Sequence, residues 1–142
     1  MPKMEKLSHY VEPQVSIVPG SKNAGAVTPV VVDASGGYDR VRHTISLGAF
    51  GTSAGFDAEV VESATSGGTY TLISGSGITL ATAAKANKLI VIDVPVNSAK
   101  PYQKLRSTVS TAAVGVCAIA DLYNGTRPLG STMEDVAEEV VV

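Results

Sequence analysis

Hydrophobic and polar residues alternate with a period of two along most of this chain, which is the pattern of half-buried β-strands. The most regular region runs from Leu89 to Tyr123. In its first and last segments, Leu89 to Val96 and Val114 to Tyr123, every even position is apolar. The segment between them, Tyr102 to Ser110, follows a turn-forming cluster and alternates as well. We expect three consecutive antiparallel strands here, which can form one sheet of a sandwich but not a complete domain.

The first half of the chain supplies further short strands separated by turn-forming residues. Asp39 to Phe50 has the cleanest alternation, with an apolar face made by Val41, His43, Ile45, Leu47 and Ala49. The other predicted strands are Val27 to Asp33, at a sheet edge because of Pro29, then Phe56 to Ser63, Tyr70 to Ile73 and Ile78 to Leu80. Residues 81–88 are a candidate helix or wide loop. The pattern predicts an all-β protein, an antiparallel β-sandwich or a barrel, with seven to eight short strands.

The two ends of the chain differ from this body. Residues 1–25 contain three prolines and little alternation, so we expect an extended N-terminal arm that is either disordered or ordered by a neighbouring subunit. Deleting this arm is then expected to leave the melting temperature nearly unchanged. Residues 131–142 place apolar side chains at roughly helical spacing, with Ser131 as a possible cap. The expected organisation is an arm at 1–25, a β-sandwich domain at 26–129 and a C-terminal tail at 130–142 that docks on its own domain or on a neighbour.

Composition narrows the function classes. The 142 residues suit one domain, and only 17% of them are charged, against about 25% in typical proteins. The net charge of −2 comes without a cluster of Lys and Arg, so nucleic acid is not the expected ligand. The first ten residues lack the apolar run of a signal peptide, and no segment has the length and hydrophobicity of a membrane span. We therefore expect the protein to stay in the cytoplasm in which it is made.

Candidate chemistry is sparse in this sequence. Neither of the two histidines belongs to a metal-binding motif, and we interpret His43 as packed on the apolar face of its strand. The glycine-rich stretches lack the Lys-Ser/Thr of a phosphate loop, and a solvated strand face explains Asp57 and Glu59 better than a calcium or acid–base site does. Cys117 is either packed against a neighbour or a reactive thiol. We expect no catalytic residues, no metal and no cofactor.

The polar face of the strand Tyr102 to Ser110 is the most informative surface. Tyr102, Lys104 and Arg106 share this face, and we select them as possible partner contacts. Their cationic groups suit an acidic partner surface, while a simple solvated face is an equally good interpretation of Lys104 and Arg106.

Three stretches make the chain resemble the head decoration, or cement, proteins of tailed bacteriophages. The first is the strand Val41 to Phe50, which ends in Leu-Gly-Ala-Phe. The second is Glu62 to Tyr70, a hairpin of the type ES-x-x-x-GG-x-Y. The third is Lys100 to Arg106, which matches an RY-x-R strand with Pro101 and Lys104 in place of the two arginines, followed by an apolar strand and a closing Arg127-Pro128. The likeness covers residues 39–128.

This resemblance implies a jelly-roll-like sandwich that decorates the outside of an icosahedral capsid. Such a protein binds across junctions between major capsid proteins as a dimer or trimer, and it assembles in the host cytoplasm. Two alternatives stay open: a neck or tail component of the same particles, and a carbohydrate- or ligand-binding β-sandwich module. The absence of Trp and the scarcity of Phe weaken the second alternative, which a stacked set of exposed tyrosines would revive. An enzyme is the weakest option.

Overall fold

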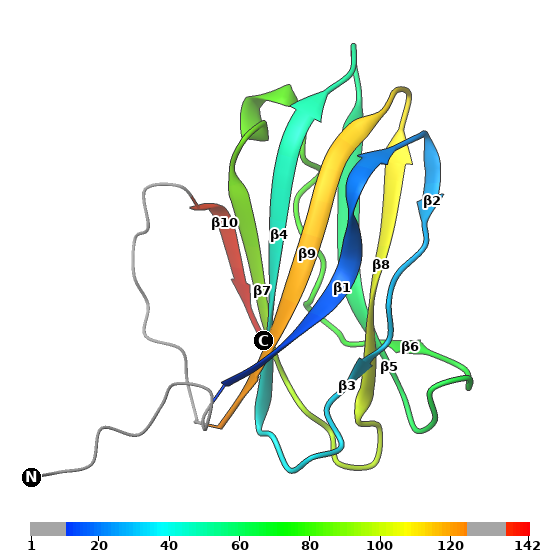
Figure 1. The fold of residues 1–142 in the computed structure, drawn as a ribbon, viewed down its shortest axis with the longest axis vertical. Coiled ribbons are helices and arrows are strands. Elements are labelled where there is room, and N and C mark those ends of the chain that lie inside the picture. Colours follow the sequence, from blue (N-terminus) through cyan, green and yellow to red (C-terminus); the bar gives the residue numbers. More distant parts are fainter. Residues whose placement is uncertain (1–10, 125–135) are drawn as a thin grey trace, which may run out of the picture.

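The computed structural model describes residues 11–124 and 136–142, and these fold into two β-sheets packed face to face (Figure 1). Sheet A has the strand order β1-β9-β4-β7-β10, and sheet B has the order β2-β8-β5-β6 with β3 also paired to β8. The strands are β1 (Val11–Lys22), β2 (Gly25–Val27), β3 (Val32–Asp33), β4 (Arg40–Phe50), β5 (Gly55–Ser63), β6 (Thr71–Leu72), β7 (Leu89–Pro95), β8 (Tyr102–Ser110), β9 (Val114–Tyr123) and β10 (Val136–Val141). The expected all-β sandwich is therefore confirmed, with more strands than the seven to eight predicted.

The strands pair in the order that defines a jelly roll. The first pairs with the last and so on inward: β1 with β9, β2 with β8, β4 with β7 and β5 with β6, all antiparallel. This is the arrangement of one long hairpin of strands wrapped around a core so that its four pairs alternate between the two sheets. The short β3 continues the edge that β2 begins, and β10 is an addition to sheet A.

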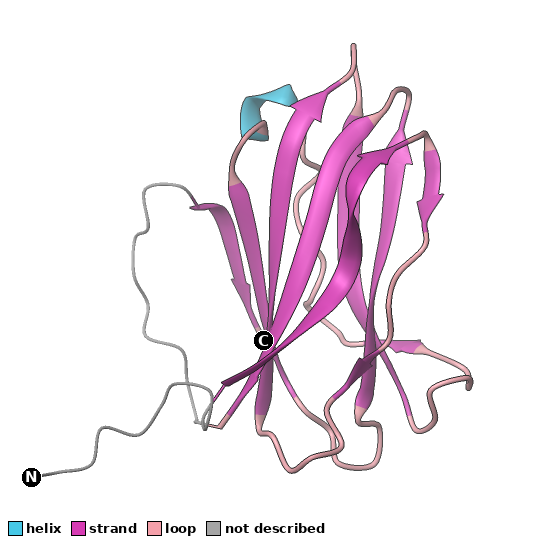
Figure 2. Cartoon of the chain, in the orientation of Figure 1, coloured by secondary structure: helices cyan, strands magenta, loops and turns pink. Residues whose placement is uncertain are grey.

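The three regular strands from 89 to 123 do not form one sheet, as the alternation had suggested. β7 and β9 lie in sheet A and are separated by β4, whereas β8 lies in sheet B. The predicted strand from Val27 to Asp33 is divided into β2 and β3, both at the edge of sheet B as Pro29 indicated. Residues 78–80 form no strand, and the candidate helix is a single 3-10 turn at Ala83–Lys85, the only helical piece of the described chain (Figure 2).

Residues 11–25 are part of the sandwich, which corrects the expectation of an arm lacking a buried face. β1 pairs with β9 over its whole length, and Ile17 is fully buried in the core. The register of this pairing shifts twice, between Val15 and Ile17 and between Ile17 and Gly20. These irregularities, together with Pro13 and Pro19, remove the alternation by which the strand might have been recognised. Residues 1–10 lie outside the described chain.

The helical spacing of apolar residues at the C-terminus also predicted the wrong conformation. Residues 136–141 form β10, which pairs in parallel with β7 at the edge of sheet A. Its register shifts once, between Val136 and Glu138, and five of its six residues are half-buried, so neither face shows a clean pattern. The predicted cap Ser131 lies outside the described residues.

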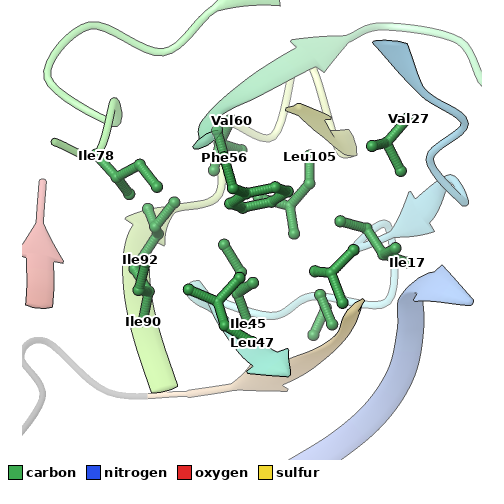
Figure 3. Packing of buried hydrophobic residues seen from close by; sticks show 14 of the residues in the cluster. Ile17, Val27, Ile45, Leu47, Phe56, Val60, Ile78, Ile90, Ile92 and Leu105 are labelled. Carbon is green, nitrogen blue, oxygen red and sulfur yellow. The ribbon is translucent and has the colours of Figure 1, made fainter. Parts of the chain in front are cut away.

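The core lies between the two sheets and is built mainly from aliphatic side chains. Phe56 of β5 occupies its centre among Ile45, Ile92 and Leu105, all without solvent exposure (Figure 3). The even positions of β7 and β9, the odd positions of β8 and the odd positions of β4 from Val41 to Leu47 point into this space, as the alternation predicted. Ala49, which was expected on the same face of β4, is exposed, because the register of β4 shifts between Leu47 and Phe50. The opposite faces of the strands are left for other contacts.

Candidate partner-binding face of sheet B

The outer face of sheet B carries the residues that the sequence selected. β8 lies between β5 and the β2/β3 edge, and its odd positions from Gln103 to Val109 are buried. Its even positions therefore point away from the core, which brings Tyr102, Lys104 and Arg106 onto one surface. Tyr102 and Lys104 are half-buried, whereas Arg106 is exposed.

Arg106 is paired across the sheet. It lies directly opposite Glu59 of β5, and its guanidinium Nε donates a hydrogen bond to Glu59 Oε1 at 2.6 Å. Both side chains remain in contact with water, and such surface ion pairs stabilise a fold by about 0–1 kcal/mol. The pair orients the guanidinium group without shielding it from a partner.

Lys104 is held by an aromatic ring instead of a carboxylate. Its ammonium nitrogen lies 4.1 Å from the centre of the Tyr70 ring, the geometry of a cation–π contact. The turn between β5 and β6 positions this ring, because the Tyr70 hydroxyl donates to the carbonyl oxygen of Ser66 at 2.8 Å. Burial, with a smaller effect of nearby Tyr102, raises the pKa of the Tyr70 hydroxyl. Within the described ranges, no carboxylate lies at ion-pair distance from Lys104.

A groove of about 400 Å³ lies along this cationic and aromatic surface. Between β2 and β3, the four residues 28–31 lie opposite only three residues of β8, 104–106. The chain therefore departs from β8 at this point, and the groove lies beside the departure. The N–H of Val30 binds the carbonyl oxygen of Ser16 in sheet A instead, at 2.9 Å. Val61, Tyr70, Lys104 and Arg106 line one part of the groove, and Ala26 and Pro29 line the other.

The sequence predicted three residues of this surface and missed two. Tyr102 adjoins the groove but does not line it, whereas Lys104 and Arg106 do. Glu59 was recognised only as part of a solvated face, and Tyr70 was noted only as part of a hairpin. Their roles depend on which strand pairs with β8 and on where the β5–β6 turn lies, and neither follows from alternation.

Two polar side chains, His43 and Asp93, are fully buried elsewhere in the structure, and His43 Nδ1 has no hydrogen-bond partner among the described residues. Burial lowers the pKa of His43 to about 4, and its ring Nε2 lies 3.0 Å from Gln103 Oε1 across the core. Asp93 is fully buried on the other side of sheet A, where the Arg40 guanidinium, 2.7 Å from Asp93 Oδ1, and the Tyr123 hydroxyl both donate to it. Burial and this hydrogen bond raise the pKa of Tyr123 to about 12. His43 is thus a packed core histidine, as interpreted from its strand.

The described residues contain no group of three or more His, Cys, Asp and Glu side chains arranged to hold a metal ion. In the same ranges, no helix has the length and apolar character needed to span a membrane. Cys117 is half-buried on the outer face of sheet A and forms no disulfide.

The fold defines the protein as an antiparallel β-sandwich with jelly-roll strand order. No protein-family model matches the chain, and no curated protein matches its sequence significantly. The functional argument therefore depends on the surfaces of this molecule.

Proposed function

We propose that the protein is a structural component of a tailed-bacteriophage virion that binds the outside of the capsid and clamps neighbouring major capsid proteins. One observation carries the proposal. Two of the stretches that resemble decoration proteins, Glu62 to Tyr70 and Lys100 to Arg106, are distant in sequence but meet on the outer face of sheet B, where Tyr70 stacks against Lys104. A shared surface is what a common partner would require.

The chemistry of this face supports protein binding. Tyr and Arg are enriched in protein interfaces, where large side chains in partly desolvated settings provide most of the affinity. Tyr70 and Tyr102 supply the aromatic surface, and Lys104 and Arg106 supply the charge. Repeated attachment over a shell allows contacts that are weak one by one to act together.

A second surface supports a dimer or trimer. Val15 of β1 and Ile119 of β9 are paired on the outer face of sheet A, and each is nearly half exposed. Burying this apolar pair between copies removes it from water. Sedimentation velocity of the purified chain over a range of protein concentrations tests this part of the proposal. A chain that stays monomeric at the highest concentration would contradict it.

The first test is the copy number per purified particle of the phage that encodes the chain, measured by quantitative mass spectrometry against the major capsid protein. A copy number comparable to that of the shell protein is expected. A small ring of copies would instead assign the protein to the neck or tail, and absence from particles would reject a virion role.

The second test locates the attachment surface. Particles stripped of the protein are mixed with purified chains, and bound protein is measured after sedimentation. The substitution Lys104→Ala is expected to weaken attachment, whereas Lys88→Ala, the same change at an exposed position next to β7, leaves it unchanged. Equal attachment of the two variants would remove the outer face of sheet B from the interface.

A further inference from the structure

β7 is apolar on both of its faces, with Asp93 as the one exception before its closing Pro95. The strand begins Leu-Ile-Val-Ile-Asp-Val, and with β10 in place all five residues from Ile90 to Val94 are buried. Short segments that combine high β-propensity, apolar side chains and little charge pair readily with other chains when their backbone is free. β7 is therefore a strand whose edge needs a cover.

The backbone groups of the odd-numbered residues of β7 face β10. On the opposite side, the carbonyl oxygen of Lys88, just before β7, accepts a hydrogen bond from the N–H of Leu47 in β4 at 3.0 Å. The carbonyl oxygen of Asp93 instead accepts from the N–H of Val142, next to β10, also at 3.0 Å. Successive residues of a strand direct their hydrogen-bonding groups to opposite sides, and the pairing of β4 with β7 has no register shift. Without β10, the odd-numbered residues would thus present unpaired donors and acceptors.

β10 covers this edge and is held there by contacts at both of its ends (Figure 1). Near its start, the Glu138 carboxylate accepts a hydrogen bond from the backbone N–H of Thr79 at 2.9 Å and forms an ion pair with Lys85 at 2.7 Å. Near its end, the Arg40 guanidinium donates to the carbonyl oxygen of Val142 at 2.9 Å. Both groups of contacts are made within one chain.

β10 is a poorer template for further pairing than the strand it covers. It is the outermost strand on this side of sheet A, and two of its six residues are glutamates. The carboxylate of Glu139 forms no ion pair within the described residues. Two such edges brought together would place like charges close to each other, which opposes their pairing. β10 thus replaces an apolar edge by a charged one.

We propose that β10 is an intramolecular guard strand, which docks on β7 of its own chain and thereby prevents β7 from pairing with other chains. The ion pair of Glu138 with Lys85 anchors the guard strand at its start. This role follows from contacts within one molecule and does not depend on the proposed virion function.

A release variant of the full chain, Glu138→Ala with Val140→Pro, tests the guard strand. The first change removes the anchor, and the second removes a backbone N–H that faces β7, since the N–H of Val142, two residues further on, bonds to β7. The matched control, Glu139→Pro, removes an N–H that points away from β7. Hydrogen exchange at the Val91 amide should become faster in the release variant and stay unchanged in the control.

Sedimentation velocity over a range of protein concentrations then measures self-association. The release variant should shift to larger species than the unaltered chain, whereas the control should not. Adding Val91→Lys to the release variant places a charge on the uncovered edge and should return the sedimentation coefficient to that of the unaltered chain. Circular dichroism verifies that each variant is folded.

Three results would overturn the proposal. Faster exchange at Val91 without larger species would mean that the uncovered edge of β7 does not pair with other chains. Larger species that persist after Val91→Lys would mean that association arises from another surface. Unchanged exchange at Val91 in the release variant would contradict the docking of β10 on which the guard depends.

Discussion

Truncating Ile17 tests whether β1 belongs to the sandwich as the structure shows. Ile17 is fully buried between the sheets, and its neighbour Val18 is 54% exposed. Replacing a buried isoleucine by alanine typically destabilises a protein by about 2–5 kcal/mol, because apolar contact is lost and a cavity remains. Exposed positions usually change stability by about 0.5 kcal/mol or less. Ile17→Ala should therefore be strongly destabilising, and Val18→Ala should be nearly silent.

The measurement is urea unfolding followed by far-UV circular dichroism, since the chain has no tryptophan. For a domain of this length, a loss of about 3 kcal/mol lowers the melting temperature by roughly 10 °C. Both substitutions should leave the slope of the unfolding transition unchanged. If the two variants unfolded at the same urea concentration, residues 11–22 would be an arm outside the core, and the pairing of β1 with β9 would be wrong in solution.

Three other predictions concern the stability of the fold. Because the pKa of His43 is lowered to about 4 from 6.5, the unfolded chain binds more protons between these values; stability should fall as pH decreases from 6.5, by up to about 1.4 kcal/mol per pH unit, and urea titrations should show this slope reduced in His43→Gln. Arg40→Met leaves Asp93 buried without its cation and should destabilise the fold by about 3–5 kcal/mol in thermal melts, whereas Arg42→Met, at a half-buried position two residues along β4, should have a much smaller effect. Gly51→Ala places a methyl group 2.8 Å from the Cβ of Ala112, so calorimetry should show a loss of about 1–3 kcal/mol, and an unchanged transition would mean that this loop relaxes freely.

Alternation located the strands but not their partners. A period of two assigns the faces of β7, β8 and β9, and of β4 as far as Leu47, correctly, because one side of each strand is buried whichever strand lies next to it. In a jelly roll, however, the neighbours of a strand are distant in sequence, as with β1 and β9. Pairing between such segments is decided by the packing of the whole core, which no local window of sequence records. The jelly-roll expectation came from the resemblance, not from the pattern.

The missed strands were both irregular edge elements. β1 contains two prolines and two register shifts, which an edge strand tolerates because one side of its backbone has no partner to satisfy. β10 has half-buried residues on both faces and a sequence, Val-Ala-Glu-Glu-Val-Val, that suits a helix as well as a strand. Its conformation is decided by the free edge of β7 and by Arg40, which lies 102 positions from Val142. Only tertiary contacts distinguish the two conformations.

The candidate site, like the fold, was predictable from the sequence only in part. The period-two pattern of β8 alone places Lys104 and Arg106 on its outward face, so the sequence was sufficient to predict their orientation. Their partners, Tyr70 and Glu59, become neighbours through the pairing of β5 with β8 and through the turn that follows β5. The groove depends on a still finer feature, the departure of residues 28–31 from the edge of β8.

The two proposed contacts lie on different sheets, and this separation makes their roles independent. Attachment to a shell would use the outer face of sheet B, and contact between copies would use the outer face of sheet A at Val15 and Ile119. Lys104→Ala should then reduce attachment to particles while leaving the sedimentation coefficient of the purified chain unchanged. Ile119→Ser should weaken the contact between copies and leave the groove beside Lys104 in place. A loss of both properties from either change would mean that one surface serves both contacts, because none of the residues that line the groove belongs to a strand of sheet A.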